Sequence, residues 1–307
     1  MEKLNHIWVF SDSIVGHEIQ SIALAQKVSN TMEVFHCGLR QPWLSFSPRI
    51  LPGFAKNIIW SKQKPNPKQP LDAIITCGRR MAAVGKYYKR LTNTKHIQIL
   101  NPTDSVENYD VIVCPEHDNL LAPNVIQIKG SLHAINTQYL LPYKKPQNKS
   151  IGILLGNPSK HFFNNIELKL NQINESYPHH DLYVCGSRRT PKRFFQKIKK
   201  ACEQAKVCWL DETDGTNPYL SILANSDVLM VTADSINMVS EACATDKTVI
   251  ILAKNQVSLK HKRFVNSLQE RLSAFGVLNS RPIPLNTLTQ GAQQVLLKLK
   301  NDAKKSP

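Results

Sequence analysis

Long apolar runs are missing from this sequence of 307 residues. The longest uninterrupted run, Val249–Ala253, has five residues, whereas a membrane-spanning helix needs roughly 20. The first residues, MEKLNHIWVFSD, hold too short an apolar stretch for a secretory signal and continue directly into a strand-like segment. The sequence therefore predicts a cytoplasmic protein, with peripheral attachment to the inner face of the membrane as an open alternative.

Paired cysteines are also missing. The chain has seven cysteines, an odd number, and none of them forms a C-x-x-C pair. Several lie inside apolar strand-like runs such as VIVC and LYVC. This pattern favours buried, reduced thiols over disulfide bonds or a zinc site.

Glycine-rich phosphate-binding motifs are absent. The 12 glycines form neither G-x-G-x-x-G nor the P-loop spacing that ends in GK[ST]. These absences disfavour an NAD-binding Rossmann site and a P-loop ATPase.

Acidic residues are in the minority, since 23 Asp and Glu stand against 39 Lys and Arg and the net charge is +16. Such a charge favours anionic partners such as nucleotides, phospholipid headgroups or nucleic acid. The densest basic stretch is Arg188–Lys206, where eight Lys and Arg residues are opposed only by Glu203. No recognised nucleic-acid-binding module and no interleaving of aromatic with basic residues occurs, so we expect no nucleic-acid partner. An anionic membrane surface remains a candidate partner.

Strand-like and helix-like segments alternate along the chain, which is the pattern of βαβ units. The polar, proline-containing stretch 141–150 divides them into two runs and is typical of an interdomain linker. We therefore predict an α/β protein of two Rossmann-like, doubly wound parallel-sheet domains, 1–145 and 146–307, facing each other across a cleft. The expected strands are His6–Phe10, Glu33–Cys37, Asn57–Trp60, Ala73–Thr76, His96–Leu100, Asp110–Cys114, Asn124–Ile128, Ile151–Leu155, Asp181–Cys185, Val207–Leu210, Val228–Val231 and Thr248–Leu252. The expected helices are Gly16–Val28, Arg79–Leu91, 161–175, 191–205, 218–225, 235–245, 259–275 and Gln290–Lys300.

The residues after the first strand suggest acid–base chemistry, because ligands of open α/β sheets gather beyond the carboxyl ends of the strands. Asp12, Gly16 and His17 lie there. Gly16 allows a close backbone approach, and a histidine at a helix start can act as general base on an acceptor hydroxyl. A helix-capping turn with an incidental histidine is the structural alternative.

Two further strand ends in the first half carry charged residues. The fourth strand is followed by C-G-R-R, which places Arg79 and Arg80 at a helix start, where we expect them on the acceptor side with Gly16. The sixth is followed by Glu116, His117 and Asp118. Three adjacent residues cannot all point at one ion from regular structure, so we expect an acceptor-binding edge or a polar loop here and no metal site.

Two strand ends in the second half have the composition of a phosphate-binding region. Small, polar and basic residues lie between a strand and a helix, and two arginines at a helix start favour a diphosphate or a carboxylate. A solvated basic helix start is the alternative. The residues are Gly156, Asn157, Ser159 and Lys160 after one strand and Ser187, Arg188 and Arg189 after the next.

The segment 217–242 is the richest in candidate ligands. A strand runs into a turn of small hydroxyl and acidic residues, and a helix begins near Ser235. Asn237 and Glu241 are four residues apart and share one face of that helix, whose start can bind phosphate while Glu241 binds ribose hydroxyls. A capped structural helix with a solvated Glu is the alternative. The candidate nucleotide-binding residues here are Asn217, Tyr219, Thr232, Asp234, Ser235, Asn237 and Glu241.

Six different motifs are distributed over most of the chain. They are W-x-x-S-D…G-H-x-x-Q (8–20), C-G-R-R (77–80), P-E-H-D (115–118), S-R-R-T-P (187–191), N-P-Y (217–219) and V-T-A-D-S-x-x-M-x-S-E-A (231–242). Jointly they resemble the mitochondrial-fission proteins of the elongated-mitochondria type, a family that looks like glycosyltransferases of the two-domain B-type fold. In those enzymes a G-H loop near the N-terminus lines the acceptor side and the second domain holds the nucleotide-sugar. The resemblance implies that His17 lies on the acceptor side and 235–241 on the donor side.

These observations together predict a metal-independent glycosyltransferase that uses a nucleotide-sugar as substrate, needs no other cofactor and acts on an envelope or lipid-linked acceptor. His17, with Asp12, would deprotonate the acceptor. Arg188, Arg189 and the helix start at Ser235 would stabilise the leaving diphosphate. A nucleotide-sugar epimerase of the same architecture and a non-enzymatic peripheral membrane or scaffold protein stay open as alternatives, as do the sugar, the acceptor and the oligomeric state.

Overall fold

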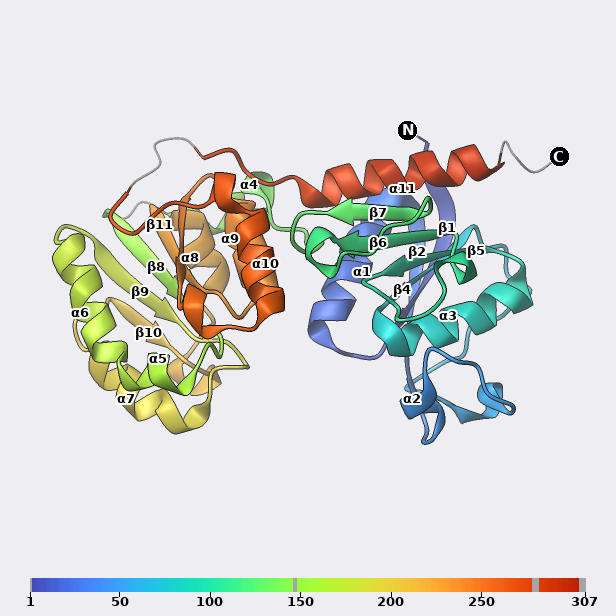
Figure 1. Ribbon diagram of the computed structural model, residues 1–307, viewed down its shortest axis with the longest axis horizontal. Helices are drawn as coiled ribbons and strands as arrows, with labels where there is room; N and C mark the ends of the chain where they lie inside the picture. Colours follow the sequence, from blue (N-terminus) through green and yellow to red (C-terminus); the bar gives the residue numbers. More distant parts are fainter. Residues whose placement is uncertain (1, 146–147, 278–281, 304–307) are drawn as a thin grey trace. The chain divides into compact units, whose positions relative to one another are not determined.

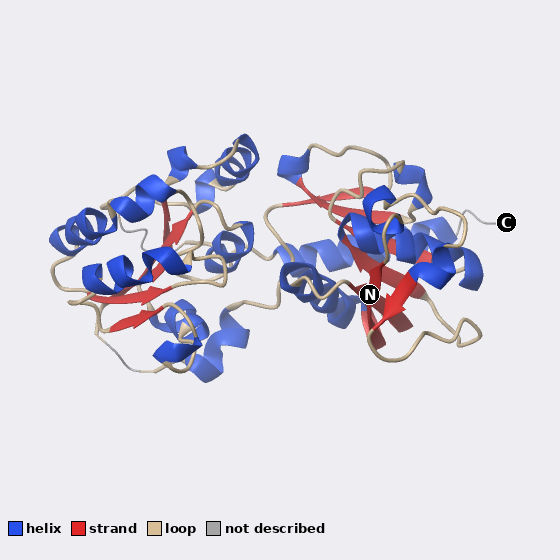
Figure 2. Cartoon of the chain, turned by 90° about the horizontal axis from the view of Figure 1, so that it is seen from below, coloured by secondary structure: helices blue, strands red, loops and turns tan. Residues whose placement is uncertain are grey.

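The chain forms two compact α/β units, in each of which helices cover both faces of a sheet (Figures 1 and 2). The computed structural model describes residues 2–145, 148–277 and 282–303. One unit is Ile135–Asn286, and the chain before and after this range forms the other.

The first unit is built on a seven-stranded sheet in the order β3-β2-β1-β4-β5-β6-β7. Its strands pair in parallel except β2 and β3, which are antiparallel. The strands are β1 (Leu4–Ser11), β2 (Ser29–Leu39), β3 (Ile58–Trp60), β4 (Ala73–Cys77), β5 (Lys95–Ile99), β6 (Val111–Pro115) and β7 (Val125–Ile128). The helices are α1 (Val15–Val28), α2 (Trp43–Phe46), α3 (Gly78–Thr92) and α11 (Thr287–Ala303).

Both faces of this sheet are buried, which explains why residues 7–10 of β1 form an unbroken apolar run rather than an alternating one. Ile7 and Val9 join the core shared with α1 and α11. Trp8 and Phe10, pointing to the opposite face, join an aromatic core shared with α3.

The second unit has a five-stranded parallel sheet in the order β10-β9-β8-β11-β12. Helices α5, α6 and α7 share a core with one face, and α8, α9 and α10 share a core with the other. The strands are β8 (Ser150–Leu154), β9 (Asp181–Cys185), β10 (Val207–Trp209), β11 (Val228–Thr232) and β12 (Thr248–Leu252). The helices are α4 (Thr137–Leu140), α5 (Lys160–Asn164), α6 (Ile166–Ser176), α7 (Phe195–Ala201), α8 (Tyr219–Asn225), α9 (Ile236–Cys243) and α10 (Leu259–Ser267).

These elements confirm the predicted fold class, and each of the predicted strands is present. Three predicted helices differ in their bounds. The helix predicted at 161–175 is divided into α5 and α6, and that at 191–205 is shortened to α7. The helix predicted at 259–275 is too long, because α10 ends at Ser267. Beyond it the chain turns so that the buried guanidinium of Arg271 can donate to the backbone carbonyls of Cys243, Thr245 and Lys247.

The boundary between the units differs from the predicted 145/146. Residues from Ile135 onward belong to the second unit, because Asn225 of α8 hydrogen-bonds the backbone of Tyr143 and Lys145 at 2.9 and 2.7 Å. The C-terminal helix α11, expected in the second domain, belongs to the first unit. It packs on α1, β6 and β7 and buries Val295 in their core.

The seven cysteines are free thiols, as predicted, and all but the half-buried Cys208 are buried. Among the helices of the described residues, none combines the length and the apolar character needed to cross a membrane.

Candidate functional site

The strand order of each sheet reverses once, between β1 and β4 in the first unit and between β8 and β11 in the second. At such a switch point the loops leave in opposite directions and open a crevice beyond the carboxyl ends of the strands. Most of the predicted site residues lie at these two places.

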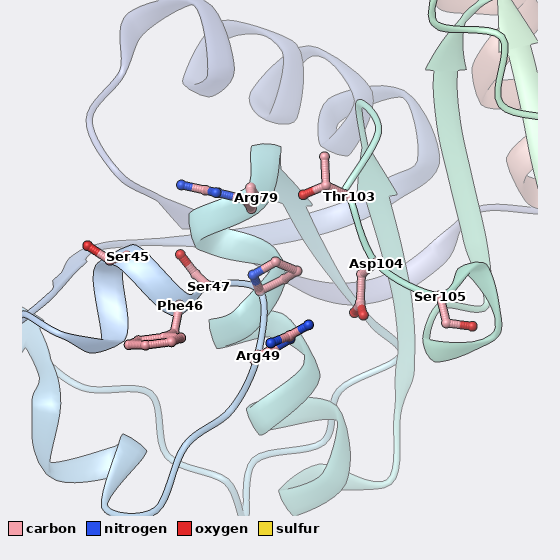
Figure 3. A pocket seen from close by; sticks show the side chains of 9 residues that line it. Ser45, Phe46, Ser47, Arg49, Arg79, Thr103, Asp104 and Ser105 are labelled. Carbon is pink, nitrogen blue, oxygen red and sulfur yellow. The ribbon is translucent and has the colours of Figure 1, made fainter.

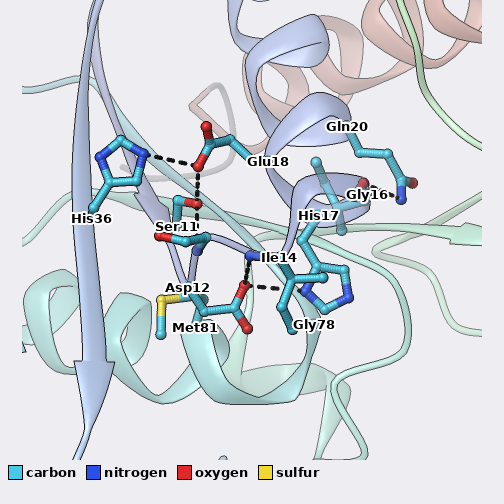
Figure 4. A network of polar contacts seen from close by, with 12 residues as sticks. Ser11, Asp12, Ile14, Gly16, His17, Glu18, Gln20, His36, Gly78 and Met81 are labelled. Atoms are coloured by element: carbon cyan, nitrogen blue, oxygen red, sulfur yellow. Dashed lines mark hydrogen bonds and ion pairs between the residues drawn. The ribbon is translucent and has the colours of Figure 1, made fainter. Parts of the chain in front are cut away.

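Asp12 and His17 come together at the switch point of the first unit (Figure 4). Asp12 Oδ1 lies 3.4 Å from His17 Nδ1 and accepts the N–H of Ile14 at 3.2 Å. Burial alone would raise the pKa of Asp12, but the His17 bond, the Ile14 N–H and the charge of Arg80 outweigh it and hold that pKa below its ordinary value. The carboxylate is therefore charged, and it faces Nδ1 of the imidazole.

The backbone of Gly78 packs directly against the His17 ring. Its φ is +75°, and a Cβ built on it would lie 2.7 Å from His17 Cε1. Only glycine therefore fits at the end of β4 beneath this histidine. The His17 side chain stays 28% exposed, so its Nε2 can still meet a ligand.

The exposed residues Arg79 and Arg80 follow directly in the first turn of α3. Gly16 lies in the first turn of α1, where its carbonyl accepts a bond from Gln20 Nε2 at 3.0 Å. The structure thus gathers Gly16, Arg79 and Arg80 around the Asp12–His17 pair.

A second histidine–carboxylate pair in the same region was missed by the sequence reasoning. His36 Nε2 lies 2.9 Å from Glu18 Oε2, and the same oxygen accepts Ser11 Oγ–H at 2.5 Å (Figure 4). His36 pairs with Ser11 in the parallel register of β1 and β2. Sequence reasoning could not place it there, because that register is not visible in the linear chain, although Glu18 beside His17 was a local signal.

Glu116, His117 and Asp118 do not join this cluster. They form a short 3-10 turn after β6, and β4 and β5 separate β6 from β1 in the sheet. His117 is buried. Among the described residues no group of three or more His, Cys, Asp or Glu side chains is arranged to hold a metal ion.

Asp234 organises the switch point of the second unit. Its Oδ2 accepts the N–H of Asn157 at 2.7 Å and lies 3.1 Å from Arg189 Nη2. Arg189 Nη1 also donates to the Asp234 carbonyl at 3.2 Å, and Gly156 N–H donates to Thr232 Oγ1 at 2.8 Å. The carboxylate therefore binds β8, β11 and the loop after β9 together.

The Asp234 carboxylate fills the space next to Gly156. A Cβ there would lie 2.5 Å from Asp234 Oδ2, and Asp234 itself is only 4% exposed. The role expected of Gly156, a close approach to phosphate, is therefore filled by a close approach to Asp234. The group offered to a ligand is the Arg189 guanidinium, whose side chain is 56% exposed.

The loop after β9 presents the two arginines. Thr190 Oγ1 accepts the N–H of Ser187 at 2.9 Å and donates to the Leu155 carbonyl at 2.8 Å, which ties the loop to the end of β8. Arg188 is exposed and makes no hydrogen bond or ion pair within the part of the chain that the structure describes.

Ser159 and Lys160 begin α5 beside this loop. Ser159 Oγ accepts the N–H of Phe162 at 3.0 Å and donates its proton to Gln256. Ser159 therefore caps the start of α5 and has no proton left to donate to a ligand. Lys160 is exposed.

His261 of α10 was also missed by the sequence reasoning. Its Nδ1 lies 2.7 Å from Ser258 Oγ. Burial lowers its pKa below the ordinary value, although the nearby Asp234 carboxylate acts in the opposite direction. No local motif marks this histidine, which only the packing of α10 brings to the end of β11.

Tyr219 and Glu241 form a pair of their own. The Tyr219 hydroxyl donates to Glu241 Oε2, and Asn217 Oδ1 accepts the Tyr219 N–H at 2.9 Å. Burial raises the pKa of Glu241 to about 7, even though the Tyr219 bond favours its charged form. Asn237 lies half-buried one turn earlier, and the buried Ser235 begins α9 without making a side-chain cap.

Sequence comparison relates the chain to mitochondrial fission proteins. The family model described as Mitochondrial fission ELM1 matches residues 15–299. Uncharacterized protein RP120 of Rickettsia prowazekii (strain Madrid E) is 29% identical over 320 residues, which cover 87% of this chain and 88% of that protein. Mitochondrial fission protein ELM1 of Arabidopsis thaliana is 24% identical over 310 residues, which cover 87% of this chain and 69% of that protein.

Structure comparison confirms the predicted B-type glycosyltransferase architecture. A glycosyltransferase from Rickettsia africae ESF-5 has a TM-score of 0.52 at 12% identity, with 97% of this chain and 89% of that chain covered. A UDP-GlcNAc 2-epimerase from Neisseria meningitidis, solved bound to UDP-GlcNAc, has a TM-score of 0.52 at 12% identity, with 97% and 100% covered. At such identities the likeness is one of fold.

Proposed function

The chain belongs to the mitochondrial fission ELM1 family, and we propose that it is a sugar-nucleotide enzyme that transfers a sugar from a nucleotide-sugar to an acceptor hydroxyl. The Asp12–His17 pair carries this proposal. A carboxylate that orients a partly exposed imidazole at a switch point is what activation of a hydroxyl requires, whereas a scaffold has no use for it.

We assign the donor nucleotide to the second unit. Arg189, held by Asp234, and the exposed Arg188 would bind the diphosphate together with the N-terminus of α9. Glu241 lies one turn into α9 and would accept bonds from the ribose hydroxyls, with Tyr219 holding its carboxyl in place.

In the reaction, His17 Nε2 takes the proton of the acceptor hydroxyl, because Nδ1 faces Asp12. The freed oxygen attacks the anomeric carbon, a new C–O bond forms, and the bond from that carbon to the nucleoside diphosphate breaks. Arg188 and Arg189 stabilise the negative charge that gathers on the leaving diphosphate, so no metal ion is required for this step.

We propose an envelope or lipid-linked molecule as the acceptor. This proposal is based on the net charge of +16, which favours binding to an anionic membrane surface, where such acceptors lie. Part of this charge gathers in the short helix α7 and the turn before it, where Lys192, Lys197 and Lys200 are exposed.

A nucleotide-sugar 2-epimerase is the second candidate, and a specific observation favours it. Epimerisation removes a proton from one face of a sugar carbon and returns a proton to the other, which calls for two acid–base groups. The first unit has two histidine–carboxylate pairs, Asp12–His17 and Glu18–His36.

Titration calorimetry with UDP-GlcNAc, UDP-glucose, ADP-glucose and GDP-mannose tests donor binding. We expect at least one to bind, and Glu241→Ala to weaken its binding about ten- to hundredfold by removing the hydrogen bonds that the carboxyl group accepts from the ribose. Release of nucleoside diphosphate only with a membrane extract supports transfer, whereas deuterium uptake into the sugar in D2O without acceptor supports epimerisation. If none of the four nucleotide-sugars binds and the protein binds anionic vesicles, both enzymatic proposals are rejected in favour of a non-enzymatic scaffold protein.

A further inference from the structure

The first unit contains a pocket of about 450 Å³ that none of the assignments above explains (Figure 3). It lies between the segment 45–49, the first turn of α3 at Arg79, and the turn 103–105 after β5. Its volume falls within the range of small-molecule sites, about 300–1,000 Å³. Its lining is formed by guanidinium and hydroxyl groups, with Phe46 as a large apolar side chain.

Two arginines from distant parts of the chain line this pocket without a partner. Arg49 comes from the loop after α2 and Arg79 from the first turn of α3. Within the described residues neither guanidinium has a hydrogen bond or an ion pair. Both arginines are exposed, so their guanidiniums are open to a ligand, and their forked N–H groups fit a phosphate best.

The carboxylate in the pocket does not cancel this charge. Asp104 is bound by Lys86 and accepts hydrogen bonds from Tyr109 and Asn108, each at 3.1 Å. Its pKa stays below the ordinary value, because the Lys86 contact and the Tyr109 bond outweigh the effect of burial. The Asp104 charge is thus balanced by Lys86, and the two arginines leave the pocket positive.

The hydroxyl groups of the lining can accept hydrogen bonds from a ligand, whereas the arginines donate them. Ser45 donates its proton to a neighbouring side chain at 2.7 Å, and Ser47 and Thr103 donate theirs to backbone carbonyls at 2.6 Å. Their oxygens therefore have lone pairs to offer and no proton to give. Such oxygens fit a ligand that carries hydroxyl groups next to its phosphate.

We propose that this pocket binds the phosphate monoester of a sugar or polyol. Arg49 and Arg79 would bind the phosphate, and the hydroxyl oxygens of the lining would accept bonds from the hydroxyls of the ligand. Phe46, 51% exposed, offers an aromatic face to the C–H side of a sugar ring.

Arg79 connects this pocket with the candidate base, because it directly follows Gly78, on which the His17 ring lies. We take the phosphorylated sugar or polyol to be the acceptor or its phosphate-bearing end. This last step rests on the proposed transfer reaction, whereas binding to the pocket does not.

Calorimetric titration of the full chain with glucose 1-phosphate, glycerol 3-phosphate and methyl glucoside tests the pocket. We expect one of the two phosphate esters to bind and the uncharged glucoside not to bind. Arg49→Gln and Arg79→Gln should each weaken that binding about tenfold or more. Arg90→Gln removes the same charge from the exposed far end of α3 and should have no effect.

Two further measurements separate the possible outcomes. Binding of UDP by the second unit should be unchanged in Arg49→Gln. Failure of the wild type to bind UDP, with binding of a phosphate ester retained, would reject the donor assignment and not the pocket. Competition by vesicles containing phosphatidic acid would show that the phosphate is carried by a lipid, and its absence that the ligand is soluble. The proposal that this pocket binds a phosphate monoester would be overturned if neither ester binds the wild type. It would also be overturned if Arg49→Gln and Arg79→Gln bind the ester as tightly as the wild type.

Discussion

The His17 ring lies against Gly78, so closely that a Cβ on residue 78 would come within 2.7 Å of His17 Cε1. His17 lies in the first turn of α1, after β1, and Gly78 begins α3 directly after β4, the neighbouring strand at the switch point. The backbone of one strand end thus determines where the candidate base of the other can be.

Gly78→Ala should displace the histidine and destabilise the first unit. The φ of +75° alone costs an alanine about 1–2 kcal/mol, and the contact with His17 adds to it. Thermal unfolding measures the loss, and Gly38→Ala, where a Cβ meets nothing within 4 Å, is the matched control. Equal melting temperatures for the two variants would contradict this packing.

His17→Ala should lower the rate of nucleoside diphosphate release with acceptor by about 10²–10⁴, the usual contribution of a general base. Asp12→Asn should lower it less, because the imidazole remains but loses its orienting charge. Binding of the nucleotide itself should not change in either variant. A rate for His17→Ala close to that of the wild type would remove this residue from the chemistry.

Asp234 should act on nucleotide binding through Arg189. Asp234→Asn keeps the shape of the side chain but weakens the 3.1 Å ion pair, so we expect about tenfold weaker binding of UDP. In an Arg189→Gln background the same change should have little further effect, and Lys197→Gln, an exposed charge on α7, should have none. Additive losses in the double variant would mean that Asp234 contacts the ligand independently.

Glu241 should make stability depend on pH. Its pKa is about 7 in the folded chain, raised by burial from 4.5, so the folded state holds a proton that the unfolded state releases between these values. Its contribution is complete below about pH 4.5 and is lost as the pH rises through 7. Denaturant unfolding should show the wild type losing about 1–3 kcal/mol relative to Glu241→Gln across that interval. Parallel curves for the two proteins would argue against a buried carboxyl.

The basic face of α7 should bind anionic vesicles. Lys192→Gln, Lys197→Gln and Lys200→Gln should each weaken binding to phosphatidylglycerol vesicles about fivefold at low salt, and high salt should erase the difference. Lys199 is left out because it lies 2.5 Å from Asp214. Loss of transfer to a soluble acceptor in the triple variant would place these lysines in the site instead.

The strands and the two switch loops could be predicted from the sequence because they depend on local information. Buried parallel strands are short apolar runs such as 7–10 and 228–231, and the residues just after them are polar or small. Asp12, His17, Arg189 and 234–241 are therefore recognisable as candidates in the sequence alone.

Other features required the folded chain, because they depend on which segments meet. His36 reaches Glu18 only through the register of β2 on β1, and His261 reaches Asp234 only through the packing of α10. The helix α11 joins the first unit because its apolar face fits the core of α1, β6 and β7.

The kind of fold and the loops that carry reactive groups therefore follow from the amino-acid sequence, since strand burial and loop polarity are properties of short segments. The partners of those groups depend on the folded structure. It showed that Asp234 holds Arg189, that Glu241 is bound by Tyr219, and that Arg49 shares a pocket with Arg79. Hydrogen bonds and charge pairs between residues so far apart in the chain exist only once the strand order has brought their loops to the same edge of a sheet.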